Sequence, residues 1–292
     1  MFNDSGPRRS GANETAMFIN HDHRIVFLHI PKCAGTTVRR PLESLNQWDE
    51  SGPHWRREHP ELGFLDFAHL PLAVLRNHFP AAFASVLEYR SFALVRDPYS
   101  RFASSVSERL RWNGGVLPAR LSRAELKKSL DTSIDYLSRP DSPSCCLPPG
   151  YIHFQRQRDY IVLDGEPVVD AVYPVERVAR LREELNACLG ADGMKLTEST
   201  PAAIHANAVL MYRYAGLRRA HRVVAPVMAR LRRVLPASAS RRIDDWMYVH
   251  RDQCARSLFA SDYVRDFVSS YYADDVELYA RVVRASGGER EQ

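Results

Sequence analysis

The sequence predicts an α/β protein with a parallel sheet flanked by helices and a largely helical C-terminal half. Three short apolar runs, at 25–30, 64–68 and 90–95, are rich in β-branched and aromatic residues, as strands buried on both faces are. Each run is followed within three residues by a proline, and then by residues with helical apolar spacing. Strands that alternate with helices in this way are typical of a parallel sheet.

Length and composition fit one globular domain. The chain has 292 residues, of which 45% are hydrophobic and 26% charged. We expect a flexible N-terminal arm over 1–22, a single domain over 23–285 and a polar tail over 286–292. The sequence gives no indication of the oligomeric state.

Charge and cysteine content limit the classes of partner and compartment. The formal net charge is +5, which is compatible with anionic ligands and does not require nucleic acid. No apolar run approaches the ~20 residues that span a bilayer, and the N-terminus lacks the apolar core of a signal peptide. Five cysteines without metal-type spacing favour a reducing compartment. We therefore expect a cytoplasmic protein without a transmembrane segment.

A tight loop suited to an anion follows the first predicted strand. Pro31 ends the strand, and small residues, one glycine and two threonines lead into a segment that can turn helical. A strand, a loop and a helix in succession point backbone N–H groups and a helix dipole at an anion, and Lys32 adds positive charge. We interpret this loop as a phosphate or sulfate cradle, although an ordinary turn is the alternative. Its candidate binding residues are Lys32, Cys33, Ala34, Gly35, Thr36 and Thr37.

The cradle is not a Walker A loop, because Lys32 follows a proline and precedes a cysteine. Cys33 lies where a helix N-terminus lowers the pKa of a thiol. No activating base is evident nearby in the sequence, so we expect Cys33 to contribute its backbone N–H rather than act as a nucleophile.

A second motif, Arg-Asp-Pro-x-x-Arg-x-x-Ser, follows the strand at 90–95. Asp97 is a good N-cap and Pro98 a good first helical residue. Arg96 at the strand end and Ser104 two turns into the helix can converge on one phosphate. We expect Arg101 to be structural or peripheral.

His69 follows the run at 64–68, where ligands of an open α/β sheet gather at the carboxyl ends of strands. Neutral histidine suits proton abstraction near pH 7. His69 is therefore a candidate base, and capping of the next helix or packing in the core is the alternative.

Together the two motifs resemble those of sulfotransferases that use 3′-phosphoadenosine 5′-phosphosulfate (PAPS), most closely the carbohydrate and heparan sulfotransferase branch, or sulfotransferase family 2. The resemblance implies a P-loop-like sheet. It implies that the first loop binds the 5′-phosphosulfate and that Arg96 and Ser104 hold the 3′-phosphate. It further implies sulfuryl transfer to an acceptor hydroxyl or amine by in-line attack, with Lys32 and His69 as catalytic residues, adenosine 3′,5′-bisphosphate (PAP) as product and no metal.

The acceptor and two rival functions remain open. A carbohydrate or small molecule is the expected acceptor, and an acidic one fits the basic chain; a lipid-linked sugar, an alcohol and a peptide tyrosine also fit. One rival is a P-loop-type phosphotransferase that uses ATP and Mg²⁺. The other is a non-catalytic basic module that binds nucleic acid or anionic lipid through the arginine-rich stretch from Arg218 to Arg233. The sequence suggests no role for Gln155 or Gln157.

The remaining pattern predicts further elements in chain order. We expect loops over 49–62, 139–150 and 196–207, and strands over 160–163 and 171–175. We expect helices over 38–48, 72–79, 98–110, 122–138, 176–189, 208–235 and 261–284.

Overall fold

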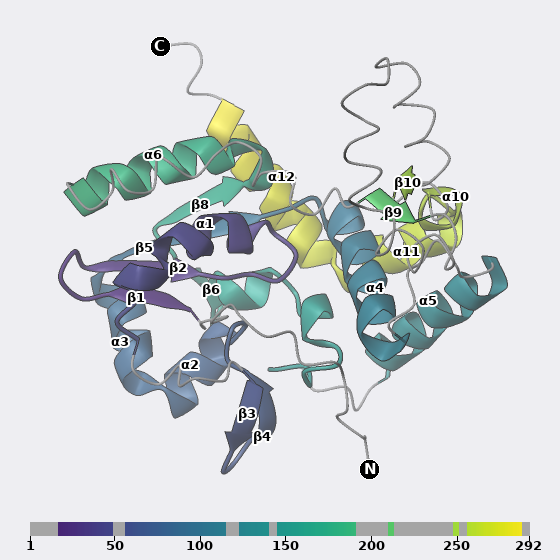
Figure 1. Ribbon diagram of the computed structural model, residues 1–292, viewed down its shortest axis with the longest axis horizontal. Coiled ribbons are helices and arrows are strands. Elements are labelled where there is room, and N and C mark those ends of the chain that lie inside the picture. The colour runs from purple at the N-terminus through teal and green to yellow at the C-terminus, as the bar shows by residue number, and fades with distance from the viewer. Residues whose placement is uncertain are drawn as a thin grey trace, which may run out of the picture.

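A computed structural model describes residues 17–48, 56–114, 123–139, 145–190, 210–212, 248–250 and 256–287. The described part is a mixed α/β protein built on a four-stranded sheet in the order β1-β2-β5-β8 (Figure 1). The strands are β1 (Phe18–Asn20), β2 (Ile25–Leu28), β5 (Arg90–Val95) and β8 (Ala171–Pro174). β2, β5 and β8 run parallel and β1 is antiparallel to β2, so the predicted fold class is confirmed at this level.

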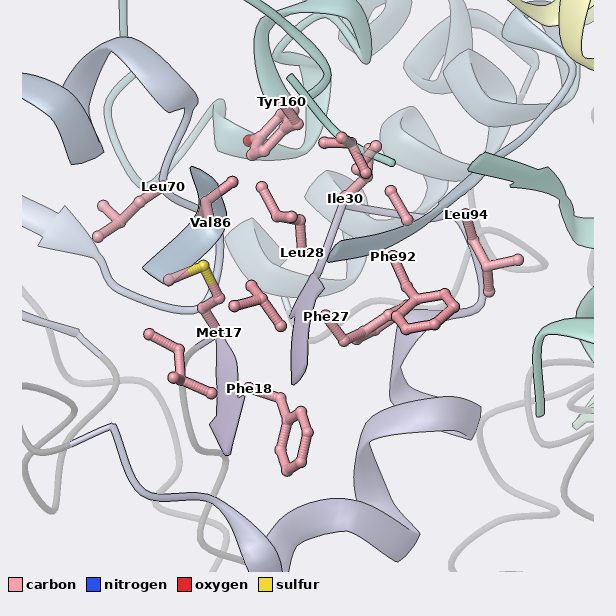
Figure 2. Close-up of a cluster of buried hydrophobic side chains, with 14 of the residues drawn as sticks. Met17, Phe18, Phe27, Leu28, Ile30, Leu70, Val86, Phe92, Leu94 and Tyr160 are labelled. Carbon is pink, nitrogen blue, oxygen red and sulfur yellow. The ribbon is translucent and has the colours of Figure 1, made fainter. Parts of the chain in front are cut away.

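The sheet is buried because its strands are apolar on both faces. Every residue of β2 is buried, and so is β5 after its first residue. Phe27 pairs with Phe92 across the parallel ladder, and Figure 2 shows the two rings lying side by side. The continuous runs Ile-Val-Phe-Leu and Ser-Phe-Ala-Leu-Val thus form strands that helices cover on both faces.

Helices enclose this sheet (Figure 1). Helices α2 (Leu72–His78) and α3 (Pro80–Glu88) lie on one side, and α1 (Gly35–Leu42) and α6 (Val178–Leu189) lie on the other. α1 continues as a 3-10 turn at Glu43–Leu45, and Pro41 lies within its last turn. The helices predicted over 72–79 and 176–189 are confirmed within a few residues, whereas α3 was not predicted.

A second apolar cluster joins helices from distant parts of the chain. α4 (Pro98–Gly114), α5 (Arg123–Leu137), α10 (Arg256–Phe259) and α11 (Asp262–Tyr271) contribute to it. Phe102 and Val106 of α4 pack there with Leu130, Val268 and Tyr272. The predicted stripe of α4 therefore does face a core, although that core is separate from the sheet.

The predicted helix over 261–284 is two helices. α11 ends at Tyr271, and α12 (Ala273–Gly287) follows it after Tyr272. α12 contacts both β8 of the sheet and α4 of the helical cluster, as its course in Figure 1 shows. Leu278 of α12 belongs to the sheet core, while Tyr272 belongs to the second cluster. The C-terminal helix thus holds the two apolar clusters together.

Other segments also differ from the prediction. The expected arm over 1–22 ends in structure, because residues 18–20 form β1 and are fully buried against β2. The run at 64–68 contributes β4 (Gly63–Asp66), which pairs with β3 (Arg56–His59) in a separate hairpin rather than with the parallel sheet. β9 (Leu210–Tyr212) pairs with β10 (Tyr248–His250), where a helix from 208 was expected.

Short elements complete the described part. The 3-10 helices Ile152–Phe154 and Arg158–Tyr160 precede the small ribbon of β6 (Val162–Leu163) and β7 (Glu166–Pro167). The 3-10 turn Val175–Arg177 joins β8 to α6. The strands predicted over 160–163 and 171–175 are thus found, and the first is shorter than expected.

A buried polar network crosses between the two clusters. The carboxylate of Asp275 in α12 accepts hydrogen bonds from the backbone N–H groups of Gln157 and Arg158, both at 2.9 Å. The same carboxylate lies 3.5 Å from Nη2 of Arg101, and both side chains are almost completely buried. Arg101 donates in turn to the carbonyl of His153 at 3.2 Å. The expectation that Arg101 is structural is confirmed.

Replacement of this carboxylate should strongly destabilise the folded protein. Asp275→Ala leaves the buried Arg101 charge without its carboxylate and removes the acceptor of two backbone N–H groups. We expect the free energy of unfolding in urea to fall by about 3–5 kcal/mol. The neighbouring Asp274 pairs with Arg158 at a half-exposed site, so Asp274→Ala should cost about 1 kcal/mol or less. Equal losses in the two variants would contradict a special role for the buried pair.

Candidate active site

The two predicted anion-binding motifs meet at one edge of the sheet. β2 and β5 are adjacent and parallel, and Leu28 pairs with Ala93, so both chains leave the sheet at their carboxyl ends side by side. The guanidinium of Arg96 donates from Nη1 to the backbone carbonyl of Lys32 at 3.4 Å. The side chain after β5 therefore contacts the loop after β2.

The loop backbone has the shape of an anion cradle. Lys32 and Ala34 both adopt left-handed conformations, with φ of 64° and 58°. Backbone that alternates in this way gathers N–H groups into a concave surface. The N–H of Cys33 donates to Ile30 and that of Thr37 to Ala34. Gly35 and Thr36 occupy the first turn of α1, where the helix itself supplies no acceptor for their N–H groups.

Gly35 is required by the imidazole that covers it. A Cβ atom on Gly35 would lie 1.9 Å from Cδ2 of His29. The His29 ring is 8% exposed and its Nδ1 is buried without a hydrogen-bond partner. The residue before the loop thus packs directly against the first turn of α1, and only glycine leaves room for it.

Lys32 is held by a carboxylate that the sequence analysis did not single out as a partner. Its Nζ lies 3.1 Å from Oε2 of Glu108, and the two side chains are 13% and 5% exposed. Glu108 belongs to α4, one turn beyond Ser104, so the two residues share a helix face. Ser104 is half-buried there. The face of α4 that carries the predicted phosphate ligand therefore also faces Lys32.

One amide joins the two loops. The side-chain oxygen of Gln157 accepts from the backbone N–H of Arg96 at 2.8 Å and from the thiol of Cys33 at 3.1 Å. Its amide nitrogen donates to the carbonyl of Arg96 at 3.0 Å. Gln157 therefore fixes the start of the second motif against the first. The other glutamine, Gln155, accepts from the backbone N–H of Leu147 and so holds the 145–150 segment.

Cys33 is buried in this arrangement. Burial raises the pKa of its thiol to about 12, although the Arg101 and Arg96 guanidinium groups oppose that shift. The thiol is therefore protonated at neutral pH and is no nucleophile. This agrees with the expectation that Cys33 is not a nucleophile.

His69 lies beside the cradle, although it follows a hairpin strand. Its Nδ1 is 3.0 Å from the backbone carbonyl of His29. Because a carbonyl only accepts, Nδ1 carries the proton and Nε2 keeps its lone pair. Burial lowers the pKa of His69 below 6.5, while the nearby Asp66 carboxylate opposes the shift. His69 is thus a neutral imidazole at pH 7 with one nitrogen ready to accept a proton.

His69 is one of three neighbouring imidazoles. Its ring centroid lies 4.5 Å from that of His29 and 5.5 Å from that of His153. Burial lowers the pKa values of His29 and His153 well below 6.5. A proton on His69 would lower them further, and the positive charge of Lys32 does so more weakly. The carbonyl of His153 is fixed by Arg101 and by the hydroxyl of Ser105, at 3.2 and 2.7 Å. This group of histidines therefore stays uncharged next to Lys32.

Two predicted regions have no structural test. The loop over 196–207 and the arginine-rich stretch from Arg218 to Arg233 lie outside the described residues. In the described ranges, no helix is long and apolar enough to cross a membrane. The same ranges contain no group of three His, Cys, Asp or Glu side chains that could hold a metal ion.

Sequence reasoning missed the residues that connect the loops. Glu108 was predicted only as part of the helix over 98–110, which is α4. Gln157 lies 61 residues from its partner Arg96, and His153 lies 84 residues from its partner His69. Asp275, which accepts from the Gln157 N–H, lies in the helix predicted over 261–284, and no partner was predicted for it.

The comparisons with known proteins identify one family. Residues 15–133, less than half of the chain, match the model of the sulfotransferase family. This segment contains the cradle, His69, Arg96, Ser104 and Glu108, so the resemblance that the two motifs indicated is confirmed. The match supports sulfuryl transfer as the general activity. No curated protein and no solved structure matched the chain.

The close approach of His29 to Gly35 predicts that a side chain at position 35 destabilises the protein only while the His29 ring is present. An alanine in a helix normally stabilises by roughly 0.5–1 kcal/mol relative to glycine. Because a Cβ at Gly35 overlaps the His29 ring, Gly35→Ala should instead lower the free energy of unfolding by about 1–3 kcal/mol. In a His29→Ala background the same substitution should cost nothing or stabilise. A loss of equal size in both backgrounds would show that the ring is not the obstacle.

Proposed function

We propose that the protein is a PAPS-dependent sulfotransferase whose domain spans residues 23–285, preceded by the β1 strand, with a P-loop-like cradle at the carboxyl edge of its sheet. The observation that supports this best is the meeting of the two motifs, where Arg96 contacts the carbonyl of Lys32. A nucleotide with phosphates at both ends needs two anion sites within its own length. The family match to residues 15–133 supports the same reaction class.

The chemistry of the carboxyl edge of the sheet supports PAPS as the donor. The 5′-phosphosulfate lies in the cradle, held by the backbone N–H groups from Ala34 to Thr36, the hydroxyls of Thr36 and Thr37 and the ammonium of Lys32. The N–H groups of Cys33 and Thr37, which were also expected to bind the anion, donate to backbone carbonyls within the loop. The 3′-phosphate lies between Arg96 and Ser104. The guanidinium of Arg96 is positioned for this role, because Gln157 fixes both the N–H and the carbonyl of its backbone.

Transfer follows from the placement of Lys32 and His69. The acceptor oxygen or nitrogen attacks sulfur in line and forms the new bond as the bond from sulfur to the phosphate oxygen breaks. That oxygen leaves with the electron pair as part of PAP, and Lys32 stabilises its growing charge. Nε2 of His69 takes the acceptor proton, because its Nδ1 is already engaged with the carbonyl of His29. This chemistry requires no metal ion.

The acceptor we propose is a hydroxyl or amine on a carbohydrate or small molecule, either acidic or neutral overall. Three uncharged imidazoles beside the cradle suit a neutral, hydrogen-bonding group at the reacting position better than an anionic one.

A comparison of ligands tests the function. PAP should raise the thermal unfolding temperature of the protein, since a ligand that binds only the folded state stabilises by mass action. ATP with Mg²⁺ and an oligonucleotide should shift it less at equal concentration. A larger shift with ATP and Mg²⁺ would favour a phosphotransferase. Stabilisation by the oligonucleotide alone, abolished by salt, would favour a basic binding module.

We expect Lys32 to contribute strongly to the rate of sulfuryl transfer. Lys32→Ala removes the one ammonium of the cradle, and single-turnover transfer from PAPS should slow by about 10²–10³-fold. The acceptor itself has to be found first, by screening hydroxyl and amine compounds with labelled donor. A loss of less than tenfold would contradict direct stabilisation of the leaving oxygen.

His69 should affect chemistry and its pH dependence but not donor binding. His69→Ala should lower the transfer rate while the Kd for PAP stays within about twofold of the unaltered chain. Because burial lowers the pKa of His69, the base is lost only when pH falls through a value below 6.5, so the acid limb of kcat/KM should lie there. That limb should vanish in the variant. Collapse of PAP binding would instead show that His69 is structural.

A further inference from the structure

The ion pair between Lys32 and Glu108 places a carboxylate inside an anion site. The two charged groups are 3.1 Å apart and the carboxylate is 5% exposed. At such burial the interaction is weakly screened by solvent and salt. An acidic side chain here opposes the binding of any nucleotide phosphate to the cradle, so it needs an explanation beyond the assembly of the fold.

Local structure gives the carboxylate a fixed place. Glu108 belongs to a helix of 17 residues that is anchored in the two turns that precede it. Arg101 is buried against Asp275, and Ser105 donates to the carbonyl of His153. Glu108 is thus carried by a rigid element, whereas Lys32 extends from a loop by a flexible side chain. The lysine, and not the glutamate, is the partner that can turn toward a ligand.

We propose that Glu108 is a positioning residue that holds the Lys32 ammonium in the donor-free site and competes with the bound nucleotide for it. This inference rests on the proposed function and adds the control of nucleotide affinity and product release to it. When PAPS enters the cradle, Lys32 leaves Glu108 for the phosphosulfate. After transfer, the carboxylate takes the ammonium back and so favours release of PAP.

Competition for Lys32 predicts that loss of the Glu108 charge increases the affinity for PAP, whereas a purely structural ion pair does not predict this increase. Neutralising Glu108 removes both the rival for Lys32 and a buried negative charge next to the phosphates. PAP should then bind more tightly. A structural ion pair whose loss only loosens the loop would instead weaken binding or leave it unchanged.

The experiment compares the Kd of PAP, measured by isothermal titration calorimetry, in the full chain and in Glu108→Gln. We expect Kd to fall about tenfold or more, which is the change that about 1.4 kcal/mol produces, and product inhibition by PAP to strengthen in parallel. Glu88→Gln is the matched control. It removes one negative charge from an exposed pair with Arg24, at the opposite end of the β2 and β5 strands, and should leave Kd unchanged.

A second variant tests the same proposal if Glu108→Gln fails to fold. Glu108→Asp keeps the charge but shortens the side chain, so it should loosen the pair and tighten PAP binding by a smaller factor. Thermal unfolding verifies that each variant is folded. If the unaltered chain binds PAP and neither substitution lowers Kd, or if Glu88→Gln lowers it equally, the role of Glu108 is overturned while the proposed function stands. If the unaltered chain does not bind PAP, both are overturned.

Discussion

The site depends on one buried carboxylate at the far end of the chain. Asp275 of α12 accepts two backbone N–H groups from the turn at 157–158 and pairs with Arg101 of α4. A turn held in this way has little freedom, because a buried N–H without an acceptor is costly. The side chain of Gln157 is therefore presented at a fixed position, and it is this amide that bonds both Arg96 and Cys33. The C-terminal helix thus fixes the geometry of two loops that precede it by more than 170 residues.

The sheet and this network supply different parts of the site. Parallel pairing of β2 and β5 brings the two loops to one edge, which any α/β sheet of this order would do. Pairing does not decide where Arg96 and Lys32 point. Their positions follow from Gln157, from the contact of Arg96 with the Lys32 carbonyl and from the pair between Lys32 and Glu108. Backbone topology brings the two loops close together, and buried polar contacts orient the Arg96 and Lys32 side chains.

These two contributions explain how much the sequence could predict. Strand β5, the Asp97 cap and the start of α4 depend on neighbouring residues, and all three were predicted; the cap is confirmed by the bond from the Ser100 N–H to the Asp97 carboxylate. The edge position of the two loops follows from strand order and was also predicted. The partners of Lys32 and Arg96 depend on tertiary packing, so local patterns carried no signal for Glu108 or Gln157. The run at 64–68 was assigned to the parallel sheet because short apolar runs look alike in hairpins and in sheets.

Neutral histidines and one carboxylate limit the positive charge at the carboxyl edge of the sheet. Burial keeps His29, His69 and His153 neutral, so the three imidazoles add no positive charge to the cradle. Lys32 is compensated by Glu108, which leaves backbone N–H groups and Arg96 as the permanent attraction for an anion. We infer that such a site binds an anion less tightly than its cations alone would permit. An enzyme that must release a doubly phosphorylated product gains from this restraint, because interactions that hold donor and product equally do not accelerate the chemical step. The carboxylate beside Lys32 is therefore consistent with turnover, whereas a module that only binds anions would have no use for it.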